Sequence, residues 1–264
     1  MRLRLDLAYD GTDFFGWAIQ PALRTVQGDL ERALATVLRT DAVRTTCAGR
    51  TDTGVHARCQ VVHVDLDLDA ESIPSLVRRL NGLLNADVRV LAGLQVPPAF
   101  NARFSALWRR YCYRIADHPN AIDPLLRRHV LTWSRPLDID RMNQAAQSLL
   151  GVHDFAAYCK RRDGATTIRE LQELSWMRDS GGRLSATVRA DAFCHNMVRS
   201  LVGALIMIGE GTRPVDWAAE VLAAKVRSSW VNVAPARGLT LEQVAYPEEA
   251  LFAAQAEATR RVRT

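Results

Sequence analysis

The order in which strand-like and helix-like hydrophobic periods follow one another constrains the fold of this chain more than any other feature. Residues 2–9 alternate apolar and polar side chains, the period of a half-buried strand, and residues 25–39 place apolar side chains at helical spacing. The next segments predict two strands, a helix and a strand, at residues 42–48, 59–66, 72–84 and 88–96. Strand, helix, strand, strand, helix, strand is the order of the ferredoxin-like split unit.

The same order occurs again after Pro97 and Pro98. The segments there predict a strand, a helix, two strands, two helices and a strand, at residues 108–116, 138–150, 166–178, 184–190, 193–208, 214–226 and 239–246. We therefore predict an α+β fold of two ferredoxin-like halves, residues 1–104 and 105–264, with a mixed, largely antiparallel sheet flanked by helices. Residues 117–135 show no clear period.

The positive charge of the chain comes almost entirely from arginine, because Lys160 and Lys225 are its only lysines. The net charge is +5. The planar guanidinium suits phosphates and base edges, but a general bias of composition gives the same count. Charge alone therefore points only weakly to a nucleic acid.

The cysteines and the apolar stretches indicate where the protein works. The five cysteines are odd in number, scattered and without a CxxC pair, which argues against a disulfide framework and against a structural zinc site. We expect reduced, buried thiols. The N-terminus lacks the apolar core of a secretory signal, and the longest apolar stretch, Ser200–Ile208, is too short to span a bilayer. We expect a cytoplasmic protein without a membrane anchor.

The most unusual segment is the polar loop between the strands predicted at 42–48 and 59–66. Threonine, aspartate and glycine are ordinary turn formers, so one interpretation is a simple hairpin turn. However, two core strands would hold Asp52 rigidly, and Arg50 precedes it by two positions on the same side of the chain. A carboxylate beside a guanidinium stays ionised and can act as a base or a nucleophile.

Two enzymatic interpretations of this loop are weak. Metal-dependent hydrolysis would use Asp52 with His56, but no second cluster of carboxylates and histidines accompanies them. An aspartic protease would use the tripeptide from Asp52 to Gly54, but such enzymes need two of these carboxylates, and the chain has one copy. A dimer would have to supply the second.

A third interpretation follows from a resemblance. Residues 50–57, Arg-Thr-Asp-Thr-Gly-Val-His-Ala, resemble the signature loop of the TruA family of tRNA pseudouridine synthases. Further matches follow in the order of the family, at residues 9–17, 25–28, 100–106, 110–114, 151–155, 193–199 and 234–239. One departure is the run from Trp17 to Gln20, where the family usually has a glutamine directly after the tryptophan.

The resemblance implies the fold, the reaction and the site. It implies a pseudouridine synthase fold that isomerises uridine at positions 38, 39 and 40 of the tRNA anticodon arm, without cofactor or metal. Asp52 corresponds to the essential aspartate of the family, Tyr111 to its active-site tyrosine, and Arg199 to the arginine that pairs with the aspartate. Arg50 would fill the space that the target uridine leaves in the base stack.

Other arginines and the partners are expected on the same basis. Basic side chains extend a wall for phosphates, at Arg58, Arg109, Arg110 and Arg114. The resemblance implies a homodimer whose subunits form a basic cleft for tRNA. The non-enzymatic alternative is an RNA-binding module that keeps this fold as a clamp. The sequence leaves open whether Asp52 attacks the ribose or removes a ribose proton to give a glycal.

Overall fold

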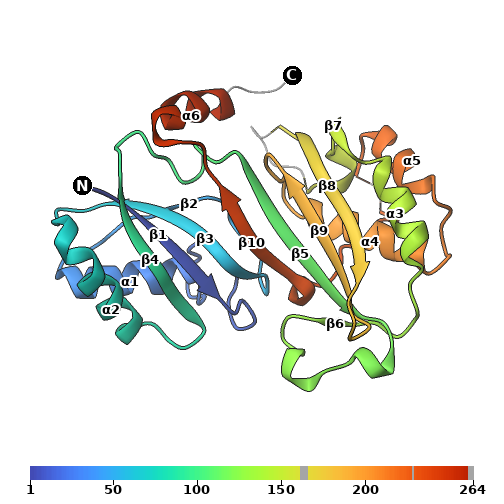
Figure 1. The fold of residues 1–264 in the computed structure, drawn as a ribbon, viewed down its shortest axis with the longest axis horizontal. Helices are drawn as coiled ribbons and strands as arrows, with labels where there is room; N and C mark the ends of the chain where they lie inside the picture. The colour runs from blue at the N-terminus through green and yellow to red at the C-terminus, as the bar shows by residue number, and fades with distance from the viewer. Residues whose placement is uncertain (161–165, 228, 261–264) are drawn as a thin grey trace. The chain divides into compact units, whose positions relative to one another are not determined.

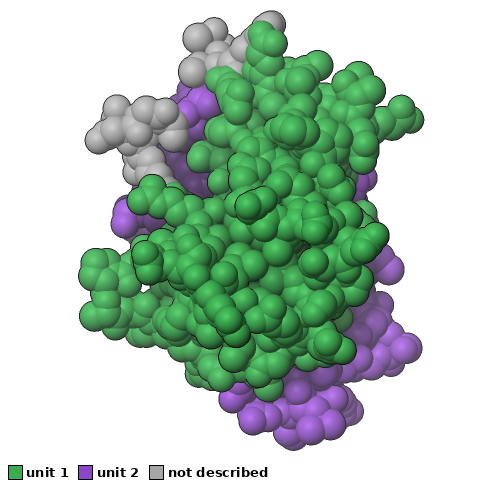
Figure 2. Space-filling model, turned by 90° about the vertical axis from the view of Figure 1, so that its left-hand side faces the viewer, with its two compact units in different colours: residues 1–107, 241–261 green, residues 108–240, 262–264 purple. Residues whose placement is uncertain are grey.

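The computed structural model describes residues 1–160, 166–227 and 229–260. The chain divides into two compact units, coloured green and purple in Figure 2. The first unit contains Met1–Leu107 and the C-terminal stretch from Leu241, and the second contains Trp108–Thr240. Each unit contributes strands of a largely antiparallel sheet together with helices, and each is described by itself (Figure 1).

The first unit has the split βαβ order that the sequence predicts. Its elements are β1 (Arg2–Tyr9), α1 (Val26–Leu38), β2 (Thr46–Cys47), β3 (His56–Asp65), α2 (Ile73–Leu83), β4 (Val88–Val96) and, near the C-terminus, α6 (Phe252–Arg260). Its strands lie in the order β4-β1-β3-β10, where β10 spans Leu239–Ala245, and β2 pairs with β3. Both neighbours of β1 are antiparallel to it.

The hydrophobic period explains these elements. Alternate leucines of β1, from Leu3 to Leu7, are fully buried, and the residues between them are half-buried. Helix α1 begins where its sequence predicts, since Thr25 is the N-cap and its side chain accepts a hydrogen bond from the Gly28 amide at 3.3 Å. A Cβ placed on Gly93 of β4 would lie 2.7 Å from Ile73, so α2 packs closely on this sheet.

The second unit carries the elements in which a second split unit was predicted. They are β5 (Trp108–Ala116), β6 (Leu131–Thr132), α3 (Ile139–Gln147), β7 (Gly151–Asp154), β8 (Ile168–Arg178), β9 (Leu184–Ala190), α4 (Met197–Gly209) and α5 (Trp217–Ala224). The strand order is β5-β9-β8-β7, all antiparallel, and β6 is parallel to β5. The predicted α+β fold with a mixed, largely antiparallel sheet is thus confirmed.

Several predicted elements are shorter than expected, and two of them have a clear local cause. The strand predicted at 42–48 is only β2, because the Glu31 carboxylate of α1 accepts hydrogen bonds from both the amide and the hydroxyl of Thr45, at 2.7 and 2.8 Å. Those bonds replace a strand ladder. The helix predicted from residue 193 begins at Met197, because Asn196 has a left-handed backbone with φ of 67°.

The chain returns to the first unit after residue 240, which the predicted division into 1–104 and 105–264 does not include. The Leu107 amide donates to the Ala245 carbonyl at 2.8 Å, and the Ser105 hydroxyl donates to the Phe252 carbonyl at 3.1 Å. The rings of Phe100 and Phe252 lie 5.1 Å apart between centroids. These contacts join the C-terminal stretch with α6 to the connector before β5, and α6 was not predicted from the sequence.

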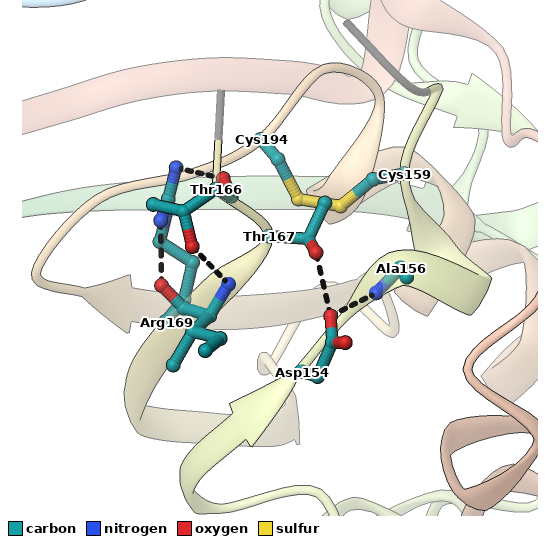
Figure 3. Close-up of a disulfide and its surroundings, with 8 residues drawn as sticks. Asp154, Ala156, Cys159, Thr166, Thr167, Arg169 and Cys194 are labelled. Atoms are coloured by element: carbon teal, nitrogen blue, oxygen red, sulfur yellow. Dashed lines mark hydrogen bonds between the residues drawn. A yellow bond between two sulfur atoms is a disulfide. The ribbon is translucent and has the colours of Figure 1, made fainter. Parts of the chain in front are cut away.

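The expectation that all cysteines are free thiols is wrong for two of them. Cys159 and Cys194 form a disulfide (Figure 3), with their Cα atoms 5.7 Å apart, which is within the usual span of such a bond. The Lys160 amide also donates to the His195 carbonyl at 2.9 Å, so the two segments are joined by backbone as well. Cys47, Cys59 and Cys112 take part in no disulfide.

Candidate active site

Asp52 lies at the start of a tight turn in the loop between β2 and β3. Its carbonyl accepts a hydrogen bond from the Val55 amide at 3.1 Å. The residue before it, Thr51, is buried, Asp52 itself is half-buried, and Arg50 is exposed. Within the loop, Thr51 therefore points into the protein and Arg50 points to solvent.

The segment after β1 packs on this loop through its backbone. The Trp17 amide donates to the Thr51 carbonyl at 3.0 Å, and the Gly54 amide donates to the Phe14 carbonyl at 3.3 Å. Gly16 has a φ of +86°, and a Cβ there would lie 2.8 Å from the Thr51 carbonyl oxygen, so the approach requires glycine. Two sequence motifs that lie far apart in the chain thus form one backbone unit.

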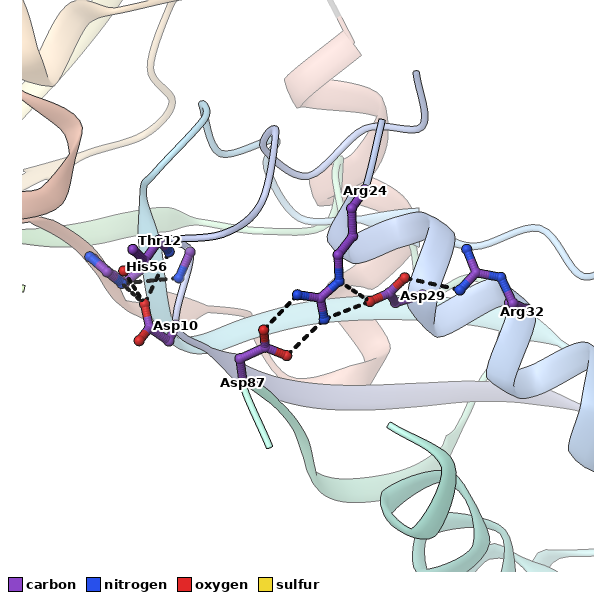
Figure 4. Close-up of polar contacts among 8 residues, drawn as sticks. Asp10, Thr12, Arg24, Asp29, Arg32, His56 and Asp87 are labelled. Atoms are coloured by element: carbon purple, nitrogen blue, oxygen red, sulfur yellow. Dashed lines mark hydrogen bonds and ion pairs between the residues drawn. The ribbon is translucent and has the colours of Figure 1, made fainter. Parts of the chain in front are cut away.

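His56 joins the same two segments by a side-chain contact (Figure 4). Its Nδ1 accepts a hydrogen bond from the Gly11 amide at 3.0 Å and also lies 3.2 Å from the Asp10 carboxylate. A nitrogen that accepts from an amide carries no proton, so the Asp10 contact is not an ion pair in this geometry. The Asp10 carboxylate instead accepts from the Thr12 amide at 3.0 Å. His56, for which the sequence indicated no chemical role, holds the turn after β1 on the loop.

A half-buried ion-pair network fixes the other end of the same segment (Figure 4). Arg24 donates to both carboxylate oxygens of Asp87 at 2.7 and 2.9 Å and to Asp29 at 2.9 Å. Hydrogen bonds from Arg24 to the Asp87 carboxylate raise the pKa of that guanidinium further above its usual value. Its carbon Cζ also lies 4.1 Å from the centroid of the Phe14 ring. This network could not be predicted from the sequence, because 63 residues separate Arg24 from Asp87.

Strand β5 of the second unit carries Tyr111. The side chain is 7% exposed, and its ring meets the Phe193 ring edge to face, with the centroids 5.2 Å apart. Tyr113, two positions on, faces the same side and donates its hydroxyl to the Pro235 carbonyl at 2.7 Å. Both tyrosines are therefore buried on one face of the strand.

Helix α4 carries Arg199 on an otherwise largely buried surface. Arg199 is half-buried, and its Nε donates to the Ala234 carbonyl at 2.7 Å. The Ala234 amide donates in turn to the Arg199 carbonyl at 3.0 Å. The segment before β10 thus orients the guanidinium, and Arg199 is not a fully exposed residue at the edge of the helix.

The three arginines of β5 that were expected in one basic wall do not share one face of the strand. Arg109 is 6% exposed and donates to the Asp191 carbonyl at 2.7 Å. Arg110 and Arg114 lie on the opposite face of β5, since successive side chains alternate along a strand. Arg58 is exposed and lies 3.4 Å from Glu242. Arg109 and Arg110 therefore do not form a continuous surface.

The predicted site residues are divided between the units. Asp52, Arg50 and Arg58 belong to the first unit. The second contains the others, which are Arg109, Arg110, Tyr111 and Arg199. Their assembly into one site stays a prediction from the resemblance.

Residues 1–160, 166–227 and 229–260 contain no group of three or more His, Cys, Asp or Glu side chains that could hold a metal ion. Within the same residues, no helix is both long and apolar enough to cross a membrane.

Comparisons with known proteins agree on one family. Residues 145–247 match the sequence model of a family described as tRNA pseudouridine synthase. A protein of Streptomyces griseus named tRNA pseudouridine synthase A is 60% identical, across all of this chain and 94% of its own length. Proteins of the same name from Frankia casuarinae and Mycobacterium leprae are 57% and 49% identical, again across the whole chain and 96% of their own length.

Among solved structures, a chain of a Cbf5-Nop10-Gar1 complex resembles 78% of this chain with a TM-score of 0.34 and 10% identity. The match covers 54% of the length of that longer chain. A likeness at that score carries no argument.

Proposed function

Because this chain belongs to the tRNA pseudouridine synthase A family, we propose that it isomerises uridine to pseudouridine in tRNA, with Asp52 as the catalytic carboxylate. The observation that carries this proposal is the 60% identity across the entire chain. The rigid turn that presents Asp52, braced by the segment after β1, supports its role. We propose uridines 38, 39 and 40 of the anticodon arm as the substrates.

The reaction rearranges bonds without net oxidation or hydrolysis. The bond between uracil N1 and ribose C1′ breaks, the base turns, and a bond between C5 and C1′ forms. The proton that leaves C5 is balanced by one that N1 takes up. Substrate and product contain the same atoms and electrons, so the chemistry itself calls for no cofactor. The detached base must stay in a pocket that excludes water.

Each proposed site residue has a distinct part in this reaction. Asp52 attacks C1′ or removes a ribose proton to give a glycal. Tyr111 stacks on uracil, and its hydroxyl relays the proton from C5. Arg199 keeps the Asp52 carboxylate ionised and oriented. Arg50, which is exposed, enters the space that the flipped uridine leaves and offsets part of an unstacking cost of a few kcal/mol.

The direct test is a position-by-position assay for pseudouridine in unmodified tRNA treated with purified protein. We expect modification at positions 38–40, and Asp52→Asn should abolish it while leaving folding and tRNA affinity nearly intact. Asp67→Asn, which changes an exposed carboxylate just after β3, is the matched control and should keep full activity. Asp52→Asn activity within tenfold of the parent would remove Asp52 from catalysis.

The two chemical routes differ in the ribose bond that breaks first. If Asp52 removes the C2′ proton, tRNA with deuterium at C2′ of the target uridine should react several-fold more slowly in a single turnover. If Asp52 attacks C1′, the deuterium should leave the rate nearly unchanged.

We propose that tRNA binds through arginines of the expected basic wall other than Arg109. Arg58 and Arg110 are the candidates for phosphate contact, because Arg109 is buried and bound to a carbonyl. Each neutralised phosphate should contribute about −0.7 to −0.9 to the slope of log affinity against log salt. Arg58→Ala should flatten that slope, whereas Arg32→Ala, which removes an exposed arginine of α1, should not.

We also propose a homodimer that works in the cytoplasm, as the resemblance implies. Light scattering of the purified protein should give twice the mass of the 29.4 kDa chain. Cell fractionation should place the protein with the soluble tRNA.

A further inference from the structure

A buried chain of polar side chains lies directly beneath the loop that carries Asp52. It consists of Tyr9 at the end of β1, Thr51 in the loop, and Gln60 in β3, which are 5%, 6% and 0% exposed. The Tyr9 Oη and Thr51 Oγ1 atoms lie 2.8 Å apart. Gln60 Nε2 donates to Tyr9 Oη at 3.3 Å and to the Gly49 carbonyl at 2.7 Å. Side chains of β1 and β3 therefore bind Thr51 and Gly49, which lie just before Asp52 in the loop.

The hydrogen bonds in this chain are mutually consistent. Because Tyr9 Oη accepts from Gln60, its own proton can go to Thr51 Oγ1. The carbonyl of Thr51 meanwhile accepts from the Trp17 amide at 3.0 Å. Thr51 is thus bound through its side chain and its backbone at once, which fixes the point from which the Asp52 side chain projects.

Tyr9 is not suited to proton transfer. Burial raises the pKa of its hydroxyl well above the usual value, although the hydrogen bonds with Thr51 and Gln60 oppose that shift. The hydroxyl therefore stays neutral at any working pH and can serve only as a hydrogen-bonding group. A buried polar network of this kind costs stability unless every member is satisfied, so its position beneath the loop calls for an explanation.

We propose that Tyr9, with Gln60, is a positioning residue that holds Thr51 and so sets the orientation of Asp52. The proposal rests on the catalytic role of Asp52 proposed above. A catalytic group displaced by about 1 Å can lose on the order of a hundredfold in rate, so one hydroxyl beneath the loop can matter to turnover without touching substrate.

Tyr9→Phe is the decisive variant, because it removes one oxygen and keeps the ring. Tyr158→Phe is its matched control. Tyr158 is equally buried, and its hydroxyl donates to the Ala218 carbonyl at 2.8 Å in the second unit. Tyr9→Phe loses two buried hydrogen bonds and Tyr158→Phe loses one, so both should lose some melting temperature, and Tyr9→Phe somewhat more.

Turnover should separate the two variants. We expect Tyr9→Phe to lower kcat by 10- to 100-fold with KM for tRNA within threefold of the parent, whereas Tyr158→Phe keeps kcat. Thr51→Val should reproduce the loss, and Thr51→Ser, which restores the hydroxyl, should recover kcat to within threefold. A kcat for Tyr9→Phe within twofold of that for Tyr158→Phe would overturn the proposal.

Hydrogen exchange gives a readout that does not depend on activity. Because the Trp17 amide donates to the Thr51 carbonyl, its exchange should quicken at least tenfold in Tyr9→Phe and not in Tyr158→Phe. Unchanged exchange of that amide contradicts the positioning role even if the enzyme proves inactive. If the parent protein is inactive and the Trp17 amide still exchanges faster in Tyr9→Phe, the result counts against the proposed function but not against the hydrogen-bonded support of the loop.

Discussion

Gly11→Ala tests the contact between the turn after β1 and the loop that carries Asp52. A Cβ on Gly11 would lie 2.0 Å from the Val55 carbonyl oxygen and 2.5 Å from its carbon, whereas real contacts of this kind are essentially never under 3.0 Å. One of the two backbones must therefore move by about 1 Å. Because the Gly11 amide donates to His56, the residue after Val55, the turn and the loop are tied together and the movement reaches the loop.

The size of the effect follows from that displacement. Overpacking of this kind costs about 1–3 kcal/mol of stability. A 1 Å displacement of the loop should lower kcat by up to about a hundredfold. The free energy of unfolding is measured by denaturant unfolding, and kcat is measured by pseudouridine formation in a prefolded tRNA.

Two other glycines are controls for the substitution itself. A Cβ on Gly49, in the same loop, or on Gly82, in α2, would meet nothing within 4 Å. Gly49→Ala should leave kcat unchanged, and Gly82→Ala should stabilise the protein by about 0.5–1 kcal/mol, because alanine favours a helix. If Gly11→Ala keeps kcat within threefold of Gly49→Ala, the loop is not held by this contact.

Three further predictions concern other parts of the chain. Asp117, whose side chain is 1% exposed, accepts from Arg178 at 2.7 and 2.9 Å and from the Leu137 amide at 2.9 Å; burial raises the pKa of this carboxyl, but these bonds outweigh it and hold the pKa below 3.8. Asp117→Asn should lower the free energy of unfolding by about 2–3 kcal/mol at pH 7, less than for a fully buried pair because Arg178 is 36% exposed. In urea unfolding, this loss should shrink as the pH falls below 3.8, because the carboxylate of the parent protein is then protonated. A loss that does not depend on pH would contradict this account. The Cys159–Cys194 bond closes a loop of 35 residues, so reductant should remove up to about 4 kcal/mol, and thiol titration of the unfolded, unreduced protein should find only Cys47, Cys59 and Cys112; five reactive thiols would refute the bond. Arg199→Leu should lose stability and activity, and adding Asp52→Asn should recover stability only; if the two changes are additive within about 0.5 kcal/mol, the residues do not interact.

The sequence determined the local elements wherever one face of an element is buried. The predicted limits of β1, β4, β5 and β9 are those of the structure. Helix α1 begins within one residue of its predicted start. These predictions succeed because the buried side chains of a strand recur every two residues and those of an amphipathic helix every 3.6 residues, so the sequence shows the period. The signature loop likewise determined the family, since its residues are contiguous.

Only the tertiary structure decided which distant residues meet. It alone placed α6 against Phe100, bound Arg24 to Asp87, joined Cys159 to Cys194, and buried Arg109 while its neighbour Arg110 faces the other way. It also revealed Tyr9 and Gln60 beneath Thr51. Contacts of this kind join single side chains across many tens of residues, and a single pair leaves no period from which one sequence could predict it.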